Sequence, residues 1–364
     1  MMYLAAALTA VTSFGSNPGA LDMYEYIPAN LAANRPLVVV MHGCTQTASA
    51  MESAGWNALA DQYGFAVVYP QQRSANQALS CFNWYTTTDI SRTGGEAESI
   101  IQMVDAEVAS HNIDKSRVYV TGLSAGAAFT AVMLATYPDR FAAGSIMSGL
   151  PYKCATDLTS ASSCQQMSST TQKTAAAWGD LVRGGDSGFS GTWPRVQIWQ
   201  GSSDYTVAPA NATELVKQWT NVWGTDQTAD ATDTISTATR TQYMAGSTIA
   251  VELYTVTGMG HAIAIGMDPD GACPATSGAY FSDEKICSTT RAAQFFDLID
   301  APSGSDSGSN NNTGSDGSSG GGDDDSQGDD SKMGGGCNAN GAAGNVGGAT
   351  LILGLALARR RART

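Results

Sequence analysis

Apolar runs that predict buried strands alternate along the chain with apolar residues at helical spacing. Residues 36–41 (PLVVVM) and 65–69 (FAVVY) are almost continuously apolar, as expected of strands covered on both faces of a parallel sheet. Residues 96–110 instead repeat apolar side chains at the spacing of one helix face. The full pattern predicts strands at 21–27, 36–41, 65–69, 118–121, 141–147, 196–199 and, as a hairpin, 240–256, and helices at 52–63, 96–110, 125–135, 210–223 and 289–299. It therefore predicts an α/β fold, a mostly parallel sheet with helices on both faces.

Three stretches depart from this alternation. Residues 71–95 look like a loop, and the Ser/Thr/Gly-rich residues 150–193 predict an excursion over the sheet. Residues 302–336 are Gly, Ser, Asp and Asn with almost nothing apolar, a composition that cannot bury enough surface to offset its ordering entropy. We therefore expect a catalytic domain at 14–301, followed by a flexible linker.

The first 13 residues are a candidate signal peptide, with a cut near Ala10. They lack the usual basic residues, because the first cation is Arg35, and a mis-set start codon would explain that absence. The alternative is an ordinary buried strand at the N-terminus.

Charge and histidine spacing narrow the chemistry. The net charge of −14 argues against a nucleic-acid partner, because phosphate binding needs clustered Lys and Arg. The three histidines (His42, His111 and His261) form neither H-x-x-H nor H-E-x-x-H, and the chain has no C-x-x-C. We therefore expect no metal site and no cofactor.

Six of the seven cysteines fall into three spaced pairs around predicted loops. Their spacing predicts the disulfides Cys44–Cys81, Cys154–Cys164 and Cys273–Cys287, although six cysteines allow fifteen pairings. Such a set suits an oxidising compartment, so we expect a secreted or cell-surface protein.

The segment 122–126 (GLSAG) lies between a predicted strand and a predicted helix. A G-x-S-x-G turn in this context is a nucleophile elbow, which presents Ser124 at the start of a helix. The alternative is a plain Gly/Ser turn. If Ser124 is the nucleophile, the amide of Ala125 should help to bind the oxyanion.

A serine nucleophile needs a base, and His261 is the only histidine after the elbow. The order of an α/β-hydrolase triad places the acid between Ser124 and His261. The candidates are Asp157, Asp180, Asp204, Glu214 and Asp226. Asp204 follows a buried strand and precedes a helix, where open α/β sheets place functional residues. Its alternative role is a turn or helix cap.

Residues after the strand 36–41 should supply the second oxyanion donor, either the amide of Cys44 or that of Thr45. A Cys44–Cys81 bridge would hold that loop rigid. His42 ends the strand and is interpreted as support for the loop, and His111 as a capping or solvent-facing residue. Trp84 is either a wall of the substrate site or part of the core, and Thr45 is a candidate substrate contact.

Five motifs occur in order: His42-Gly43-Cys44-Thr45-Gln46, Cys81-Phe82-Asn83-Trp84, the elbow, Gly201-Ser202-Ser203-Asp204 and Gly258-Met259-Gly260-His261. Together they resemble the polyhydroxybutyrate depolymerase esterase family, which also holds feruloyl and acetylxylan esterases of carbohydrate esterase family one. The resemblance covers residues 14–300. It implies an α/β-hydrolase fold, extracellular ester hydrolysis, a triad of Ser124, Asp204 and His261, and the Cys44 amide as an oxyanion donor. No aromatic-rich polymer-binding module follows the linker, so we expect weak activity on crystalline polymer.

The C-terminal residues 337–364 contain Cys337, an apolar run at 349–358 and an arginine cluster at 359–363. They resemble the GlyGly-CTERM or MYXO-CTERM sorting signals of Gram-negative bacteria. This resemblance implies a cleaved surface-sorting signal with a transient membrane contact. The alternative is a permanent anchor whose arginines stay cytoplasmic.

The sequence therefore leaves three functions open. The first is a monomeric serine esterase that acts on short polyhydroxyalkanoate or on feruloyl or acetyl esters of plant-wall xylan. The second is a serine peptidase of the same fold. The third is a non-catalytic relative that binds carbohydrate.

Overall fold

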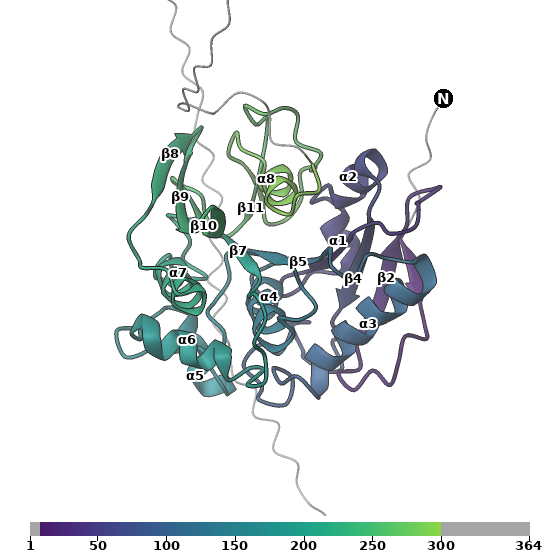
Figure 1. Cartoon of the computed structure of the whole chain (residues 1–364), viewed down its shortest axis with the longest axis horizontal. Coiled ribbons are helices and arrows are strands. Elements are labelled where there is room, and N and C mark those ends of the chain that lie inside the picture. The colour runs from purple at the N-terminus through teal and green to yellow at the C-terminus, as the bar shows by residue number, and fades with distance from the viewer. Residues whose placement is uncertain (1–7, 300–364) are drawn as a thin grey trace, which may run out of the picture. The chain divides into compact units, whose positions relative to one another are not determined.

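A ten-stranded sheet forms the centre of residues 8–299, which are the residues that the computed structural model describes (Figure 1). Its strands are β1 (Thr9–Val11), β2 (Asp22–Tyr26), β3 (Leu37–Met41), β4 (Ala66–Gln71), β5 (Val118–Leu123), β6 (Ala143–Met147), β7 (Arg195–Gly201), β8 (Ala231–Ile235), β9 (Ala238–Ala245) and β10 (Thr248–Val256). They lie in the order β1-β2-β4-β3-β5-β6-β7-β10-β9-β8. The strands from β4 to β10 in this order are parallel, and the outer pairs at both edges are antiparallel.

The central strands are buried on both faces, which explains their continuous apolar sequence. Along β3, Val39 and Met41 pack into one hydrophobic core, whereas Val38 and Val40 pack into the other. Successive side chains of a strand point to opposite faces, so an unbroken apolar run serves two cores at once.

Helices cover the two faces separately (Figure 1). On one side lie α3 (Gly95–His111), α4 (Ala125–Thr136), α6 (Ala175–Arg183) and α7 (Ala210–Trp223), and on the other lie α1 (Ala48–Glu52), α2 (Trp56–Tyr63) and α8 (Ser288–Phe295). Every residue of α4 is buried, which is why its sequence has no charged residue and is mostly apolar. The predicted α/β-hydrolase fold, with a mostly parallel sheet covered on both faces, is confirmed.

Local details differ from the sequence predictions. The helix expected at 52–63 begins only at Trp56, as α2, because Gly55 before it adopts a left-handed φ of 87°. Glu52 instead ends α1, a short helix that was not predicted. The excursion at 150–193 contains the helix α5 (Leu158–Gln165), whose Ser-rich sequence resembles a loop, and α6, a short Ala-rich helix within the same polar segment. The exposed strand β8 and the two-stranded sheet of β11 (Ile263–Ile265) and β12 (Phe281–Asp283) were also not predicted.

Near the N-terminus, β1 pairs antiparallel with β2, so the expected cleavage site near Ala10 falls within an exposed edge strand. The signal peptide stays a prediction. The predicted linker 302–336 and sorting signal 337–364 lie outside the described residues. Among residues 8–299, no helix is both long and apolar enough to span a bilayer.

The start of α4 lies against the end of β3, at a distance that only glycine permits. A Cβ atom on Gly126 would stand 2.5 Å from the carbonyl oxygen of Met41 and 2.6 Å from that of His42. These are backbone atoms, which cannot move aside as a flexible side chain would. Gly126 therefore sets how closely the helix after Ser124 approaches the loop after β3.

We predict that Gly126→Ala lowers the free energy of unfolding by about 1–3 kcal/mol through this overlap. Alanine is intrinsically better than glycine in a helix by about 1 kcal/mol, so a loss would identify the steric contact. Urea unfolding of both proteins measures the effect. Gly188→Ala is the matched control, because an added Cβ there would have only one neighbour, at 3.8 Å. Equal stability of wild type and Gly126→Ala would contradict the prediction.

Candidate active site

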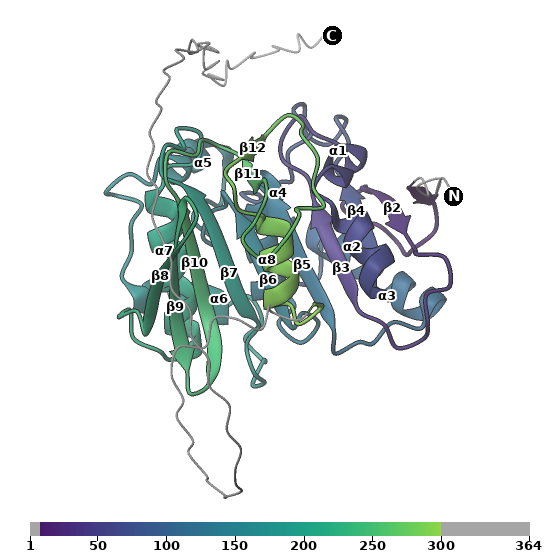
Figure 2. The ribbon, with the colours of Figure 1, turned by 90° about the horizontal axis from the view of Figure 1, so that it is seen from above.

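The three predicted catalytic residues follow the carboxyl ends of parallel strands. Ser124 comes directly after β5, Asp204 follows β7, and His261 follows β10. Because these strands run in the same direction in one sheet, the three residues lie along one edge of it. In Figure 2, β11 and β12 lie at the same end of the sheet as α1. Strand β11 follows His261, and α1 follows β3.

Ser124 occupies a strained turn between β5 and α4. Its backbone has φ 58° and ψ −117°, a conformation that costs a non-glycine residue about 1–3 kcal/mol. Two hydrogen bonds hold it there: its amide donates to the oxygen of Met147 at 3.0 Å, and its carbonyl accepts from the amide of Ala128 at 2.8 Å. This geometry turns the serine out of the strand and leaves its side chain partly exposed.

Asp204 and His261 form a direct hydrogen bond. The imidazole Nδ1 lies 2.8 Å from Oδ2 of Asp204, whose side chain is 0% exposed. The other carboxylate oxygen accepts from the amides of Thr206 and Val207, both at 2.9 Å. Burial acts most strongly and would raise the pKa of Asp204, but the hydrogen bonds from His261 and from the two amides outweigh it. The pKa of Asp204 is therefore lowered, which keeps the acid ionised beside the imidazole.

A close backbone approach brings these two loops together. A Cβ on Gly201 would overlap the carbonyl oxygens of Met259 and Gly260, so the loop of His261 packs directly on the end of β7. The amide of Ser203 donates to the oxygen of Met259 at 2.9 Å. The glycine of the Gly-Ser-Ser-Asp motif is thus needed for the His261–Asp204 contact.

The other acidic candidates have different partners. Asp157 caps α5, Asp180 pairs with Arg183, Glu214 binds Trp178 and Lys217, and Asp226 accepts from the amide of Thr228. Only Asp204 among these candidates contacts His261. Ser124 and His261 share no hydrogen bond in the part of the chain that the structure describes, and in unliganded hydrolases this bond is often long or misaligned.

Two backbone amides near Ser124 were predicted to bind an oxyanion. A Cβ on Gly43 would stand 3.4 Å from Cβ of Ser124, so the loop after β3 lies against the elbow. The Thr45 amide is occupied, because it donates to the oxygen of Leu79 at 2.7 Å. Within residues 8–299, the amides of Cys44 and Ala125 donate to no protein acceptor. Of the two alternatives for the second donor, this arrangement favours Cys44.

The cysteines pair as their spacing predicts, in the disulfides Cys44–Cys81, Cys154–Cys164 and Cys273–Cys287. The first joins the loop after β3 to the long loop after β4, so a covalent bond restrains the residue that carries the Cys44 amide. An oxyanion donor must be preorganised to be effective, and a covalent bridge restricts its motion.

The side chain of His42 links the same loop to the residue that follows β4. It is buried, its Nδ1 donates to the oxygen of Gly43 at 2.7 Å, and its Nε2 accepts from the amide of Gln72 at 3.1 Å. The bond from Gln72 requires an unprotonated Nε2 and hence a neutral ring. Burial lowers the pKa of His42 to about 4, although the bond to Gly43 opposes this shift. His42 is therefore a neutral strut and not a base, as the sequence analysis expected.

A network of buried polar residues, which were not predicted from the sequence, extends from His42. The side chain of Gln72 donates to Glu96, and Glu96 also accepts from the amide and side chain of Asn83. Burial raises the pKa of Glu96 to about 8, opposed by these hydrogen bonds. Asn83 belongs to the Cys-Phe-Asn-Trp motif, so this network anchors that motif at the start of α3.

The two predicted substrate contacts differ in exposure. Thr45 is exposed at the edge of the sheet, next to Cys44. Trp84 is 5% exposed and packs in the core with its ring against Tyr85, which favours the core-packing alternative. Exposed aromatic side chains instead come from Tyr205, beside Asp204, and from Tyr280, whose ring centroid lies 6.2 Å from that of His261.

Tyr280 reaches His261 through a long-range contact. It lies in the loop before β12, and the side chain of Gln46 donates to the oxygen of the neighbouring Ala279 at 3.3 Å. The Oε1 atom of Gln46 also accepts from the amide of Gly43 at 2.8 Å. Gln46 therefore ties the loop of Tyr280 to the loop that carries the Cys44 amide.

Known proteins match both the sequence and this arrangement. Residues 21–263 match the family described as Esterase PHB depolymerase. The chain is 54% identical over 294 residues to poly(3-hydroxyalkanoate) depolymerase C of Paucimonas lemoignei, covering 80% of this chain and 70% of the relative. It is 38% identical over 269 residues to feruloyl esterase B of Talaromyces funiculosus, covering 71% and 74% respectively. The acetyl xylan esterase from Aspergillus awamori superposes with a TM-score of 0.69 at 30% identity, over 81% of this chain and 100% of its own.

We predict that His42 makes stability fall as the pH decreases from about 6.5 to about 4. The pKa of His42 is lowered in the folded state, so above pH 6.5 the ring is neutral in both the folded and the unfolded chain. Between these values the unfolded chain binds a proton that the folded chain excludes, which costs up to about 3 kcal/mol of stability. Urea unfolding at pH 7.5, 5.5 and 4.5 measures this slope.

His42→Gln is the comparison, because its amide can donate and accept but does not titrate. The unfolding free energy of wild type should fall more steeply with decreasing pH than that of the variant. Asp204 and the other carboxyl groups are present in both proteins and cancel in the difference. Parallel slopes would contradict the role given to His42.

Proposed function

The chain belongs to the esterase PHB depolymerase family, which makes it a carboxylic ester hydrolase, and we propose that it works outside the cell through an acyl-enzyme on Ser124. The observation that carries this mechanism is the hydrogen bond of 2.8 Å between His261 and the buried Asp204, on the same edge of the sheet as the strained Ser124.

In the proposed reaction, His261 accepts the hydroxyl proton of Ser124 as the oxygen attacks the ester carbonyl. Asp204 holds the ring by its Nδ1–H and stabilises the imidazolium that forms. The amides of Cys44 and Ala125 donate to the oxyanion. His261 then gives the proton to the leaving alcohol, and a water molecule, activated in the same way, releases the acid from Ser124.

We further propose short polyhydroxyalkanoate as the main substrate class, with feruloyl or acetyl esters of xylan as the runner-up. Support comes from the higher identity to the polyhydroxyalkanoate depolymerase, 54% against 38% for the feruloyl esterase. The exposed side chains of Thr45, Tyr205 and Tyr280 would contact the substrate around the reacting ester, whereas Trp84 is packed in the core.

The proposed location is extracellular or on the surface of a Gram-negative bacterium, with the catalytic domain acting as a monomer. Three disulfides within residues 8–299 support an oxidising compartment. The proposed cleaved signals at 1–13 and 337–364, and the linker at 302–336, fit such a route. A membrane contact would be transient and limited to the sorting segment.

The first of two predictions from this proposal concerns the triad. We expect Ser124→Ala and His261→Ala each to lower kcat on p-nitrophenyl butyrate by roughly 10⁴-fold or more, and the double variant to be hardly worse. Asp204→Asn should lose roughly 10⁴-fold through loss of ring orientation. Circular dichroism of each variant checks that the fold is retained.

Asp180→Asn and Asp226→Asn are matched controls, because both remove a carboxylate that was a candidate acid and that has other partners. They should keep wild-type kcat. Additive losses in the double variant, or a larger loss in Asp180→Asn than in Asp204→Asn, would refute the assignment of the triad.

The second prediction concerns the substrate. With Ser124→Ala as the blank, we expect release of hydroxy acids from amorphous polyhydroxybutyrate and from its soluble oligomers, and slower release of ferulate or acetate from substituted xylan. Peptide anilides should not be cleaved, because amides require better leaving-group protonation than esters do. Comparable cleavage of peptide anilides would favour the peptidase alternative, and no turnover of any ester would favour the non-catalytic one.

A further inference from the structure

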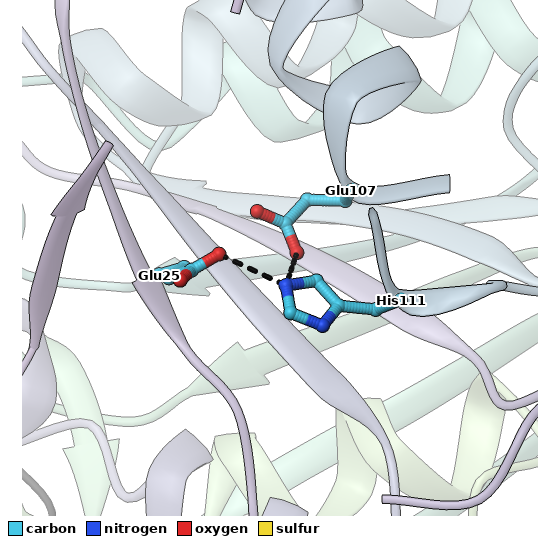
Figure 3. Close-up of side chains that lie close together, drawn as sticks. All are labelled: Glu25, Glu107 and His111. Atoms are coloured by element: carbon cyan, nitrogen blue, oxygen red, sulfur yellow. Dashed lines mark hydrogen bonds and ion pairs between the residues drawn. The ribbon is translucent and has the colours of Figure 1, made fainter. Parts of the chain in front are cut away.

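A second group of titratable side chains lies away from the catalytic edge. Glu25 on β2 and Glu107 and His111 on α3 point toward one another (Figure 3). The Nε2 atom of His111 lies 3.2 Å from a carboxylate oxygen of Glu25 and 3.8 Å from one of Glu107. Glu107 and His111 are one helical turn apart, so α3 presents both on the same face.

The carboxylate of Glu107 is buried, and within residues 8–299 His111 is its only ion-pair partner. The side chain of Glu107 is 1% exposed, and its Oε2 atom, which points at His111, accepts no hydrogen bond among the described residues. Within residues 8–299, neither Glu25 nor Glu107 pairs with a lysine or an arginine. A buried carboxylate oxygen without a hydrogen-bond donor is costly, because burial removes the water that would otherwise donate to it. The buried Oε2 atom of Glu107 therefore points into the cluster without a hydrogen-bond partner among the described residues.

We propose that Glu25, Glu107 and His111 bind a divalent transition-metal ion of the Zn²⁺ class. One imidazole nitrogen and two carboxylate oxygens are donors that such ions accept. The three ligand atoms lie within 4.8 Å of one another, and a tetrahedral ion with ligands at about 2 Å would hold them ~3.3 Å apart. Small side-chain rotations close this difference, and water fills the remaining position.

The ion can enter from solvent, because the side chains of His111 and Glu25 are 27% and 17% exposed. The site is structural and not catalytic. In the sheet order, β4 and β3 separate β2 from β5, the strand that carries Ser124. His111 is the last residue of α3, so the ion would fasten the end of this helix to a strand near the edge of the sheet.

The sequence predicted no metal site, because its histidines and cysteines lack the spacing of common metal-ligand motifs. Here the local signal is only Glu-x-x-x-His on a helix, and the third ligand lies 86 residues before His111. The ordinary alternative is a protonated His111 that pairs with the two carboxylates. This alternative predicts no response to a metal ion, so the two interpretations can be separated.

The test is thermal unfolding of the full chain, freed of metal with EDTA and then dialysed into chelator-free buffer. A Cys337→Ser background removes the seventh cysteine as a competing ligand. We expect ZnCl₂ to raise Tm saturably by several degrees, CaCl₂ at the same concentration to raise it little, and calorimetry to give one Zn²⁺ per chain. Hydrolysis of p-nitrophenyl butyrate should be the same with and without EDTA, so the result is independent of the proposed triad.

Glu25→Gln and His111→Gln should each abolish the Tm response to ZnCl₂. Glu98→Gln, also on α3 and hydrogen-bonded to Gln102 rather than to the cluster, should keep it. A wild-type Tm that does not respond to ZnCl₂ would overturn the proposal, even if Glu25→Gln and His111→Gln were less stable in EDTA. A response that persists in both variants would also overturn it, because the ion would then bind elsewhere.

Discussion

The candidate active site depends on the close approach of two backbone segments at the start of α4. Gly126 lets that helix come within contact of the carbonyl groups that end β3, and a side chain of any size would push them apart. The strained backbone of Ser124 is held between this contact and the hydrogen bond to Met147. The amides of Cys44 and Ala125 come from the two segments that meet here. Their separation is therefore set by packing and not by the flexibility of either loop.

Rigidity of the loop after β3 comes from several constraints that act on neighbouring atoms. His42 holds the carbonyl of Gly43 from the core side, Gln46 holds its amide, and the disulfide to Cys81 holds Cys44. Each is modest alone, because a single hydrogen bond contributes about 1 kcal/mol net. Together they leave the Cys44 amide with no alternative partner and little freedom, which is what a preorganised oxyanion donor requires.

The sequence predicted those parts of the site that depend on local backbone geometry. Ser124 sits in a turn whose glycines and flanking apolar runs are adjacent in the chain, and Asp204 and His261 each follow a strand that its apolarity reveals. The link from Gln46 to Ala279 joins residues 233 positions apart, and no local pattern encodes it. The same holds for Tyr280 and for the meeting of Glu25 with Glu107. Helix α5 was missed because its Ser residues look like loop composition. Helix α6 is a short Ala-rich stretch within the same polar segment, and the surface on which it packs comes from α7, later in the chain.

The distribution of exposure around the proposed triad bears on how a substrate approaches. The side chains of Asp204 and His261 are 0% and 9% exposed, whereas Tyr205 is 88% exposed and Tyr280 is 42% exposed. The proposed acid and base are thus protected from solvent, which strengthens their interaction because the local dielectric is low. The neighbouring side chains of Tyr205 and Tyr280 are exposed to water, and they would bury contact area only when a substrate covers them. Such an arrangement suits a chain that lies across the edge of the sheet with one ester over Ser124. It therefore favours an oligomeric or polymeric ester over a small molecule that must be enclosed on all sides.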